Sequence, residues 1–251
     1  MSFWQGVLVF LAGLWAGTIN TVVGSGTLVS FPTLLAIGLN PVTANVSNTL
    51  GLFPGSFVGA YGYRRELVGQ RARVASLSVA ITIGSVAGSL LLLVLPSSAF
   101  KAIVPVLIAV ALLLVIFGRH INTWLAARGS HASEHVTTPL WVSMLGTGVY
   151  GGYFGAAQGI LQMGLFGIFL KDDIQRQNGL KNVLSGLVNL VAAIVFVIIG
   201  KHLDWAVAGL IAAGSICGGV LGARIGRRLP PGVLRAVIVA VGVAAIVKLL
   251  I

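Results

Sequence analysis

Hydrophobic residues form long runs along the whole chain, and short clusters of charged residues, prolines and glycines separate these runs. The runs lack the alternating polarity, in stretches of about ten residues, that is typical of membrane β-barrels. Most approach or exceed the roughly 20 residues with which an α-helix crosses a bilayer. The pattern predicts an all-α integral membrane protein with ten hydrophobic segments, at about 3–23, 27–38, 41–63, 73–95, 99–118, 139–154, 158–170, 177–199, 205–223 and 232–250.

Two of these segments are short. Segments 2 and 7 (27–38 and 158–170) span about 18–20 Å as helices, whereas the hydrocarbon core is about 30 Å thick. Each follows a glycine-rich break, GSG at 24–26 and GGYFG at 151–155. We therefore expect two half-helices that begin inside the membrane, where protein or a water-filled cavity covers their unpaired backbone groups.

The two halves of the chain resemble each other. Gly17 and Gly24 have counterparts 131 residues later, at Gly148 and Gly155, and the Asn-x-Leu of 48–50 recurs at 182–184. We expect a first transmembrane repeat over 1–118, a linker loop over 119–138 and a second repeat over 139–251. Such internal duplication is common in secondary transporters.

Composition and charge agree with a membrane protein and set its topology. The chain is 57% hydrophobic and 8% charged, against about 25% charged in soluble domains. If all ten segments cross, 12 of the 16 basic residues lie on one face, Lys181 lies within a segment, and the other face receives Lys101, Lys201 and Lys248. The positive-inside rule favours this arrangement over one in which segments 2 and 7 return to their starting side. Because each repeat then holds five segments, the two repeats are expected to be inverted in a multi-pass protein of the lipid bilayer.

The starts of the two short segments are candidate anion sites, because a helix N-terminus offers free N–H donors and a partial positive charge. The inverted repeat is expected to bring both starts together near the midplane. The alternative is that the glycines serve only close helix packing. The candidate substrate-binding residues in these breaks are Gly24, Ser25, Gly26, Thr27, Gly155, Gln158 and Gly159.

Polar residues within the third and eighth segments complete the candidate site. Lys181 lies inside a hydrophobic segment, where an ionisable residue is a functional candidate; the alternative is that its ammonium reaches the nearby interface. Asn182 follows it, and Asn48 is the counterpart of Asn182 in the polar stretch NVSNTLGLFP at 45–54. We expect these side chains to line a cavity, with interhelical hydrogen bonding of Asn45 and Asn48 as the alternative.

The sequence lacks the residues that several classes of function require. All five acidic residues and all four histidines lie in loops or at segment edges, which argues against a metal-cation site and against a carboxylate proton relay. The spacing of His131 and His135 alone is compatible with zinc, and the single cysteine, Cys217, excludes an internal disulfide and a Cys-based metal cluster. No nucleotide-binding motif or catalytic set is present, and the net charge of +11 lies in loops rather than in a nucleic-acid-binding patch. We expect no enzyme, cofactor, metal or nucleic-acid partner.

The stretches NTVVGSGTLVSFPTLLAIGLNPVTANVSNTLGLFPGSFVGAYGYRREL and YGGYFGAAQGILQMGLFGIFLKDDIQRQNGLKNVLSGLVN resemble the sulfite exporter TauE/SafE family, also called the toluene-sulfonate uptake permease family. The resemblance covers both halves of the chain. It implies a secondary transporter of the bacterial inner membrane that moves small sulfur-containing anions such as sulfite, sulfonates or sulfoacetate, with the proton as candidate coupling ion. The chain departs from the family's usual glycine triplet at Ser25 and at 156–158.

The leading hypothesis is a gradient-driven permease for a small sulfur-containing oxyanion, with Lys181 balancing the substrate's charge. A transporter of a metal cation or a neutral metabolite is the alternative, and a membrane scaffold, which would not need duplicated short helices, is a more distant one. A homo-oligomer is compatible with the sequence.

Overall fold

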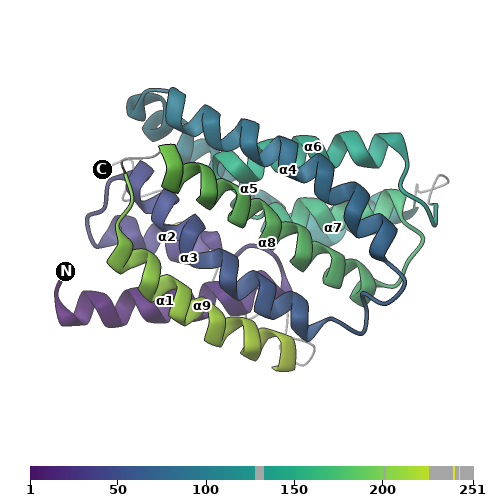
Figure 1. The fold of residues 1–251 in the computed structure, drawn as a ribbon, viewed down its shortest axis with the longest axis horizontal. Helices are drawn as coiled ribbons and strands as arrows, with labels where there is room; N and C mark the ends of the chain where they lie inside the picture. The colour runs from purple at the N-terminus through teal and green to yellow at the C-terminus, as the bar shows by residue number, and fades with distance from the viewer. Residues whose placement is uncertain (128–132, 200–201, 226–239, 241–242, 244–251) are drawn as a thin grey trace.

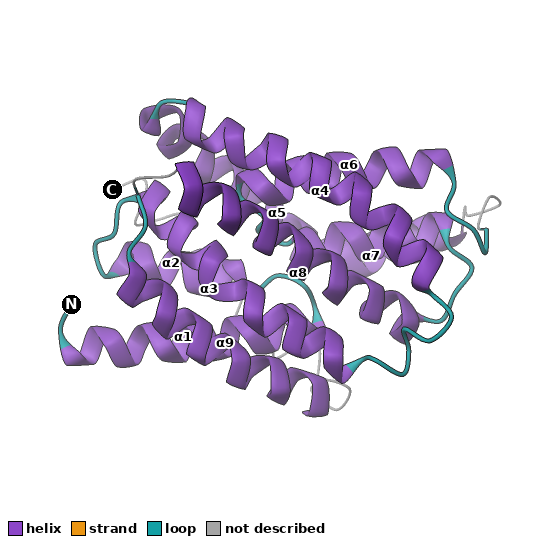
Figure 2. Ribbon diagram, viewed as in Figure 1, coloured by secondary structure: helices purple, strands orange, loops and turns teal. Residues whose placement is uncertain are grey.

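The computed structural model describes residues 1–127, 133–199 and 202–225, together with residues 240 and 243. All regular elements of the described residues are α-helices (Figures 1 and 2). They are α1 (Phe3–Val22), α2 (Thr27–Ala36), α3 (Pro41–Gly62), α4 (Arg71–Val94), α5 (Ser97–Ala127), α6 (Thr138–Tyr153), α7 (Gln158–Phe169), α8 (Ile174–Ile199) and α9 (Trp205–Ile225). The predicted tenth segment, 232–250, lies outside the described ranges.

The expected lengths are largely confirmed. Helices α1, α4, α5, α8 and α9 are long and apolar enough to cross a membrane, whereas α2 and α7 are apolar helices of 10 and 12 residues. Asn40 caps α3 through its side chain, and Pro41 provides its preorganised first residue. Helix α5 continues to Ala127, so the first part of the expected linker 119–138 is helical instead.

The helices of the two halves pack in matching pairs (Figure 1). Helix α9 packs against α1 and α3 of the first half. In the same way, α4 packs against α6 and α8 of the second half. Helices α3 and α8, the counterparts of each other in sequence, pack against one another as well. Helix α4 of the first half therefore packs against the second half, and α9 of the second half packs against the first. Each half needs a helix of the other for its packing.

Small residues allow these helices to approach closely. Gly84 and Gly88 on α4 face α6, and a Cβ added at Gly88 would lie 2.0 Å from the carbonyl oxygen of Val149. Gly214 and Gly218 play the same part between α9 and α1, where a Cβ at Gly218 would lie 2.1 Å from the oxygen of Leu14. The motif Gly-Ser-x-x-Gly thus occurs at 84–88 and again at 214–218, a repeat that the sequence analysis missed. For these glycines, tight packing is sufficient explanation.

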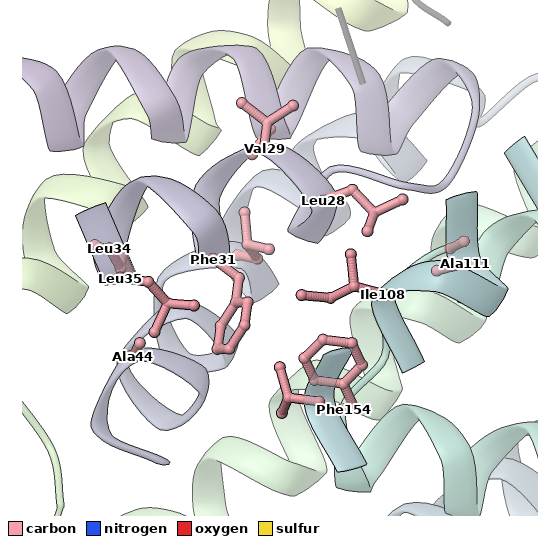
Figure 3. Close-up of a cluster of buried hydrophobic side chains, with 14 of the residues drawn as sticks. Leu28, Val29, Phe31, Leu34, Leu35, Ala44, Ile108, Ala111 and Phe154 are labelled. Atoms are coloured by element: carbon pink, nitrogen blue, oxygen red, sulfur yellow. The ribbon is translucent and has the colours of Figure 1, made fainter. Parts of the chain in front are cut away.

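The short helix α2 is held by a hydrophobic cluster rather than by its own length. Figure 3 shows Leu28 and Phe31 of α2 with Ile108 of α5 and Phe154, which precedes α7. The rings of Phe31 and Phe154 meet edge to face with their centroids 5.2 Å apart. Because isolated helices of this length are marginal, this packing stabilises α2 and fixes where its N-terminus lies.

The loops that follow α3, α5 and α7 meet at one end of the bundle, as the charge bias predicts. Asp172 forms ion pairs with Arg73 and with Arg176, the latter at 2.8 Å, and Arg73 also donates to the carbonyl oxygen of Glu134 at 2.8 Å. Burial raises the pKa of Asp172, but hydrogen bonds from Arg73 and the Asp173 backbone, with the charges of both arginines, outweigh burial and hold that pKa below its usual value. This cluster of Arg73, Asp172 and Arg176, the ionic cluster, joins the two halves.

The opposite end of the bundle carries a pocket instead. The loops after α2, α4 and α8, with the adjoining ends of α3, α4 and α5, line a space of about 190 Å³, whose polar residues are Asn40, Ser97 and His202. The two halves are joined here by a hydrogen bond of 3.0 Å from the backbone of Asp204 to the hydroxyl of Ser47. The two ends therefore differ in chemistry, with ion pairs at one and mostly neutral groups at the other.

Candidate functional site

Two breaks in the helices define the candidate site. Helix α1 gives way to α2 through residues 23–26, the first break, and α6 gives way to α7 through residues 154–157, the second break. In the first, the amides of Val23 and Gly24 both donate to the oxygen of Ile19. In the second, the amides at 154 and 155 both donate to Tyr150 in the same way. Each pair ends on a glycine with positive φ, 86° at Gly24 and 74° at Gly155.

The start of α7 lies directly against the first break. The amide of Gly159 donates to the carbonyl oxygen of Gly24 at 2.9 Å. A Cβ added at Gly24 would lie 2.4 Å from the Cα of Gly159, so this contact requires glycine at both positions. The sequence analysis expected both residues to leave room for a ligand; here their backbones contact each other, and the Gly159 amide has a protein acceptor.

The first break is organised by a residue that the sequence analysis did not single out. Asn20, near the end of α1, accepts a hydrogen bond from the amide of Gly26 at 3.3 Å and donates to the hydroxyl of Ser56 at 3.3 Å. The hydroxyl of Ser25 is buried without a partner among the described residues, and Thr27 begins α2 as a buried residue. An asparagine inside an otherwise apolar segment, just before a glycine-rich break, was the available signal.

Lys181 lies at the centre of the site and has no exposed surface. Its Nζ donates to the carbonyl oxygens of Asn20 at 2.9 Å and Thr21 at 3.1 Å, and its Cδ would lie 3.0 Å from a Cβ added at Gly159. The ammonium thus caps the C-terminal end of α1, whose last carbonyls lack partners within the helix. It does not reach the membrane interface, and no described carboxylate forms an ion pair with it.

Two asparagines on the same face of α8 support this cap. The side-chain amides of Asn178 and Asn182 donate to the oxygen of Thr21 at 3.4 and 3.2 Å. The oxygen of Asn178 is buried without a partner among the described residues. Asn182 therefore lies at the predicted site, and Asn178 joins it.

The second break is served by α3. Asn45 donates from its side-chain amide to the carbonyl oxygen of Tyr153, the last residue of α6, at 3.0 Å. Asn48 is 1% exposed, and its side-chain oxygen has no partner among the described residues. Gln158 folds back over Gly151, with its Nε2 buried and also unpartnered. The polar stretch at 45–54 thus provides one interhelical hydrogen bond at this break, and the side-chain oxygens of Asn45 and Asn48 are both buried without a partner among the described residues.

The geometry joins part of the predicted set and leaves part of it separate. Gly159 contacts both Gly24 and Lys181, and Lys181 shares the carbonyl oxygen of Thr21 with Asn182. Asn20 links Gly26 to this group. Ser25 lies in the first break, Gln158 begins α7 and Asn48 lies on α3; all three are buried, and the described hydrogen bonds of Lys181 involve none of them. A buried lysine without a carboxylate partner among the described residues, the start of α2 and unpaired donors such as Nε2 of Gln158 together suit a small anion.

Comparison with known proteins agrees with the sequence resemblance. Residues 9–249 match the family model described as Sulfite exporter TauE/SafE. The chain is 29% identical to a protein from Sinorhizobium sp named probable membrane transporter protein ORF9, over 100% of this chain and 94% of that protein. It is 27% identical to the probable membrane transporter protein YfcA of Escherichia coli K12, over 98% and 89% of the two chains. A probable membrane transporter protein from Haemophilus influenzae is 25% identical over 87% of this chain and 84% of its own length. No solved structure gives a significant match.

Proposed function

Since the chain belongs to the sulfite exporter TauE/SafE family of membrane transporters, we propose that it is a secondary-active permease for a small sulfur-containing oxyanion, such as sulfite or an organosulfonate. It is a multi-pass membrane protein and a transporter rather than an enzyme. Its relatives are bacterial, and we place it in the bacterial inner membrane.

The observation that carries the proposal is the complete burial of Lys181 without a carboxylate partner among the described residues. A buried ammonium is costly unless other groups compensate it, and carbonyl oxygens supply only partial charge. Lys181 has two carbonyl acceptors, no described carboxylate partner and no exposure. A bound oxyanion next to this ammonium would complete its third hydrogen bond and balance its charge, which gives the site a reason to prefer anions.

Groups around the breaks supply hydrogen bonds for the oxygens of such an anion. The hydroxyl of Ser25 and the Nε2 of Gln158 are buried donors without described partners. The amide of Thr27, at the start of α2, also lacks a described acceptor. The start of α2 adds the positive end of a helix dipole. We assign these three residues, with Lys181 and Asn182, to the anion.

We further propose that the two halves form an inverted repeat. Two observations support this symmetry: α1 contacts α9 as α6 contacts α4, and at each break two successive amides donate to one carbonyl oxygen. In such transporters the site near the midplane opens to each side in turn as one repeat moves against the other. In the proposed cycle the ionic cluster and the pocket lie at opposite ends of that path.

Any proton that moves with the anion travels on the substrate or through Lys181. The acidic residues with described positions are confined to loops and helix edges, so they offer no carboxylate relay through the site. The proposed energy source is therefore a gradient of ions or of the substrate itself.

Ligand binding tests the proposal in purified protein. Thermal unfolding in detergent is measured with sulfite, sulfate, thiosulfate, sulfoacetate and taurine at constant ionic strength. A ligand present at a hundred times its Kd stabilises the folded state by about 2.7 kcal/mol, a readily measured rise in midpoint. We expect at least one sulfur oxyanion to raise the midpoint in a saturable way; no response to any of them would remove the proposed substrate class.

Transport in proteoliposomes tests the role of Lys181. Lys181→Ala is expected to abolish transport, and Lys181→Arg to retain part of it because the positive charge remains. Lys171→Ala, at an exposed lysine in the loop before α8, is the matched control and should transport normally. Normal transport by correctly folded Lys181→Ala protein would exclude Lys181 from the mechanism.

A further inference from the structure

The C-terminal ends of α1 and α6 share one backbone geometry but not one set of partners. At the end of α1, the oxygens of Asn20 and Thr21 accept hydrogen bonds from the ammonium of Lys181, and Thr21 also accepts from two asparagines. The equivalent residues at the end of α6, 131 positions later, are Gly151 and Gly152. Among the described residues, no group donates to either of their carbonyl oxygens.

The side chains next to the α6 end supply further acceptors. The oxygens of Asn45 and Asn48 are buried without hydrogen-bond partners, and each residue is only 1% exposed. The amide nitrogen of Asn45 contacts Tyr153 at 3.0 Å, which places its oxygen at the end of α6. Asn48 lies three residues further along α3, on the same helix face. The oxygen of Gln158 also lies close to Gly151.

We infer that the C-terminal end of α6 binds a small monovalent cation, with sodium as the best candidate, through the carbonyl oxygens of Gly151 and Gly152 and the side-chain oxygens of Asn45 and Asn48. The ion takes the place that the ammonium of Lys181 takes at the end of α1. On α3, the position equivalent to Lys181 is Ser47, which carries no charge.

The chemistry of the ligands selects the type of ion. Carbonyl and amide oxygens at a half-helix end coordinate sodium in other transporters, and a helix C-terminus carries a partial negative charge. All four oxygens are neutral, so they cannot offset the second charge of a divalent ion, which favours carboxylate ligands. Unpaired acceptors buried in a membrane protein are costly, and a cation satisfies several of them at once.

The inferred site does not depend on the proposed function for its existence, but its role in transport does. With an oxyanion bound at Lys181, a cation at the α6 end adds positive charge to the same buried region and draws on the ion gradient. Sodium binding and anion binding are then expected to favour each other.

Thermal unfolding of the full chain in sodium, potassium or choline chloride at equal ionic strength tests the inference. We expect sodium to raise the midpoint in a saturable way, with less effect from potassium and none beyond ionic strength from choline. Asn48→Ala is expected to weaken the apparent sodium affinity at least tenfold. Its counterpart Asn182→Ala, at the α1 end, should keep the sodium response and serves as the matched control.

A second variant guards against simple misfolding of Asn48→Ala. Asn48→Asp keeps the size of the side chain and adds a negative charge, so it should bind sodium about tenfold more tightly and begin to respond to calcium. Equal midpoints in sodium and choline, with Asn48→Asp also unresponsive, would overturn the inference. Since stabilisation by sulfite is measured separately in choline, loss of the sodium site and loss of the proposed function give different results.

Discussion

The two helix breaks have the same backbone geometry but different side-chain partners. Each ends a long helix with two amides donating to one carbonyl oxygen and a glycine of positive φ, and each then starts a short helix. The first break receives a lysine and two asparagines from α8, whereas the second receives Asn45 from α3. The same backbone geometry thus occurs at two breaks with different chemistry, one beside a buried lysine and one beside unpaired side-chain oxygens.

The difference shows how two breaks of similar backbone geometry become chemically unequal. The helices that cap each break come from the opposite half, so a substitution in one half changes the chemistry at the break of the other. Lys181, in the second half, places its amino group at the first break. The ends of the bundle differ as well. Ion pairs of the ionic cluster join the two halves at one end, whereas a hydrogen bond from the Asp204 amide to the Ser47 hydroxyl joins them at the other.

The largest expected effect is on the free energy of unfolding, and it comes from replacing the glycine of the first break. Gly24→Ala introduces both a strained φ and a clash with Gly159, and we expect it to destabilise the fold by about 2–5 kcal/mol. Gly155→Ala meets no atom closer than 3.0 Å, and Gly38→Ala, also at positive φ, meets none within 4 Å. Each of these should cost only about 1–2 kcal/mol from strain. Unfolding in denaturant measures all three; equal losses at 24 and 38 would mean that the Gly24–Gly159 contact is unimportant.

The next effect tests the difference between the two ends of the bundle. Asp172→Asn removes the carboxylate of the ionic cluster and should destabilise the protein at pH 7 by roughly 1–3 kcal/mol. Because the folded-state pKa of Asp172 lies below the unfolded value of about 3.9, its contribution is present above that pH and disappears as the pH falls through the folded-state pKa. Thermal midpoints measured between pH 7 and pH 3 should therefore show a steeper acid loss for the wild type than for Asp172→Asn. Parallel curves would contradict this assignment.

The smallest effect compares the two caps directly. Asn45→Ala leaves the carbonyl of Tyr153 without its described donor, which should cost about 0.6–2 kcal/mol. Asn182→Ala leaves Thr21 with Lys181 and Asn178 as donors, so its loss should stay below about 0.6 kcal/mol. Both variants are unfolded in choline chloride, which separates the hydrogen bond from the inferred sodium site. A larger loss for Asn182→Ala would reverse the comparison.

Much of the architecture followed from the order of residues. Hydrophobic runs fixed the helices because a bilayer admits only backbones that satisfy their own hydrogen bonds, and the short segments 2 and 7 were visible as runs too short to cross. The basic loops predicted which connections share a face, since charge asymmetry orients membrane helices. Lys181 and Asn182 were identifiable because polar side chains within such runs are costly and need partners.

Only the tertiary structure decided what those partners are. Whether Lys181 reaches the interface or turns inward depends on α1 ending beside α8, a contact between residues 160 positions apart in the sequence. Likewise, the glycines at 24 and 159 admit each other's backbone rather than a ligand, and Asn45 meets the end of α6. Hydropathy and spacing record what each residue prefers along its own helix, whereas the partners of buried polar groups depend on which helix ends the packing brings together.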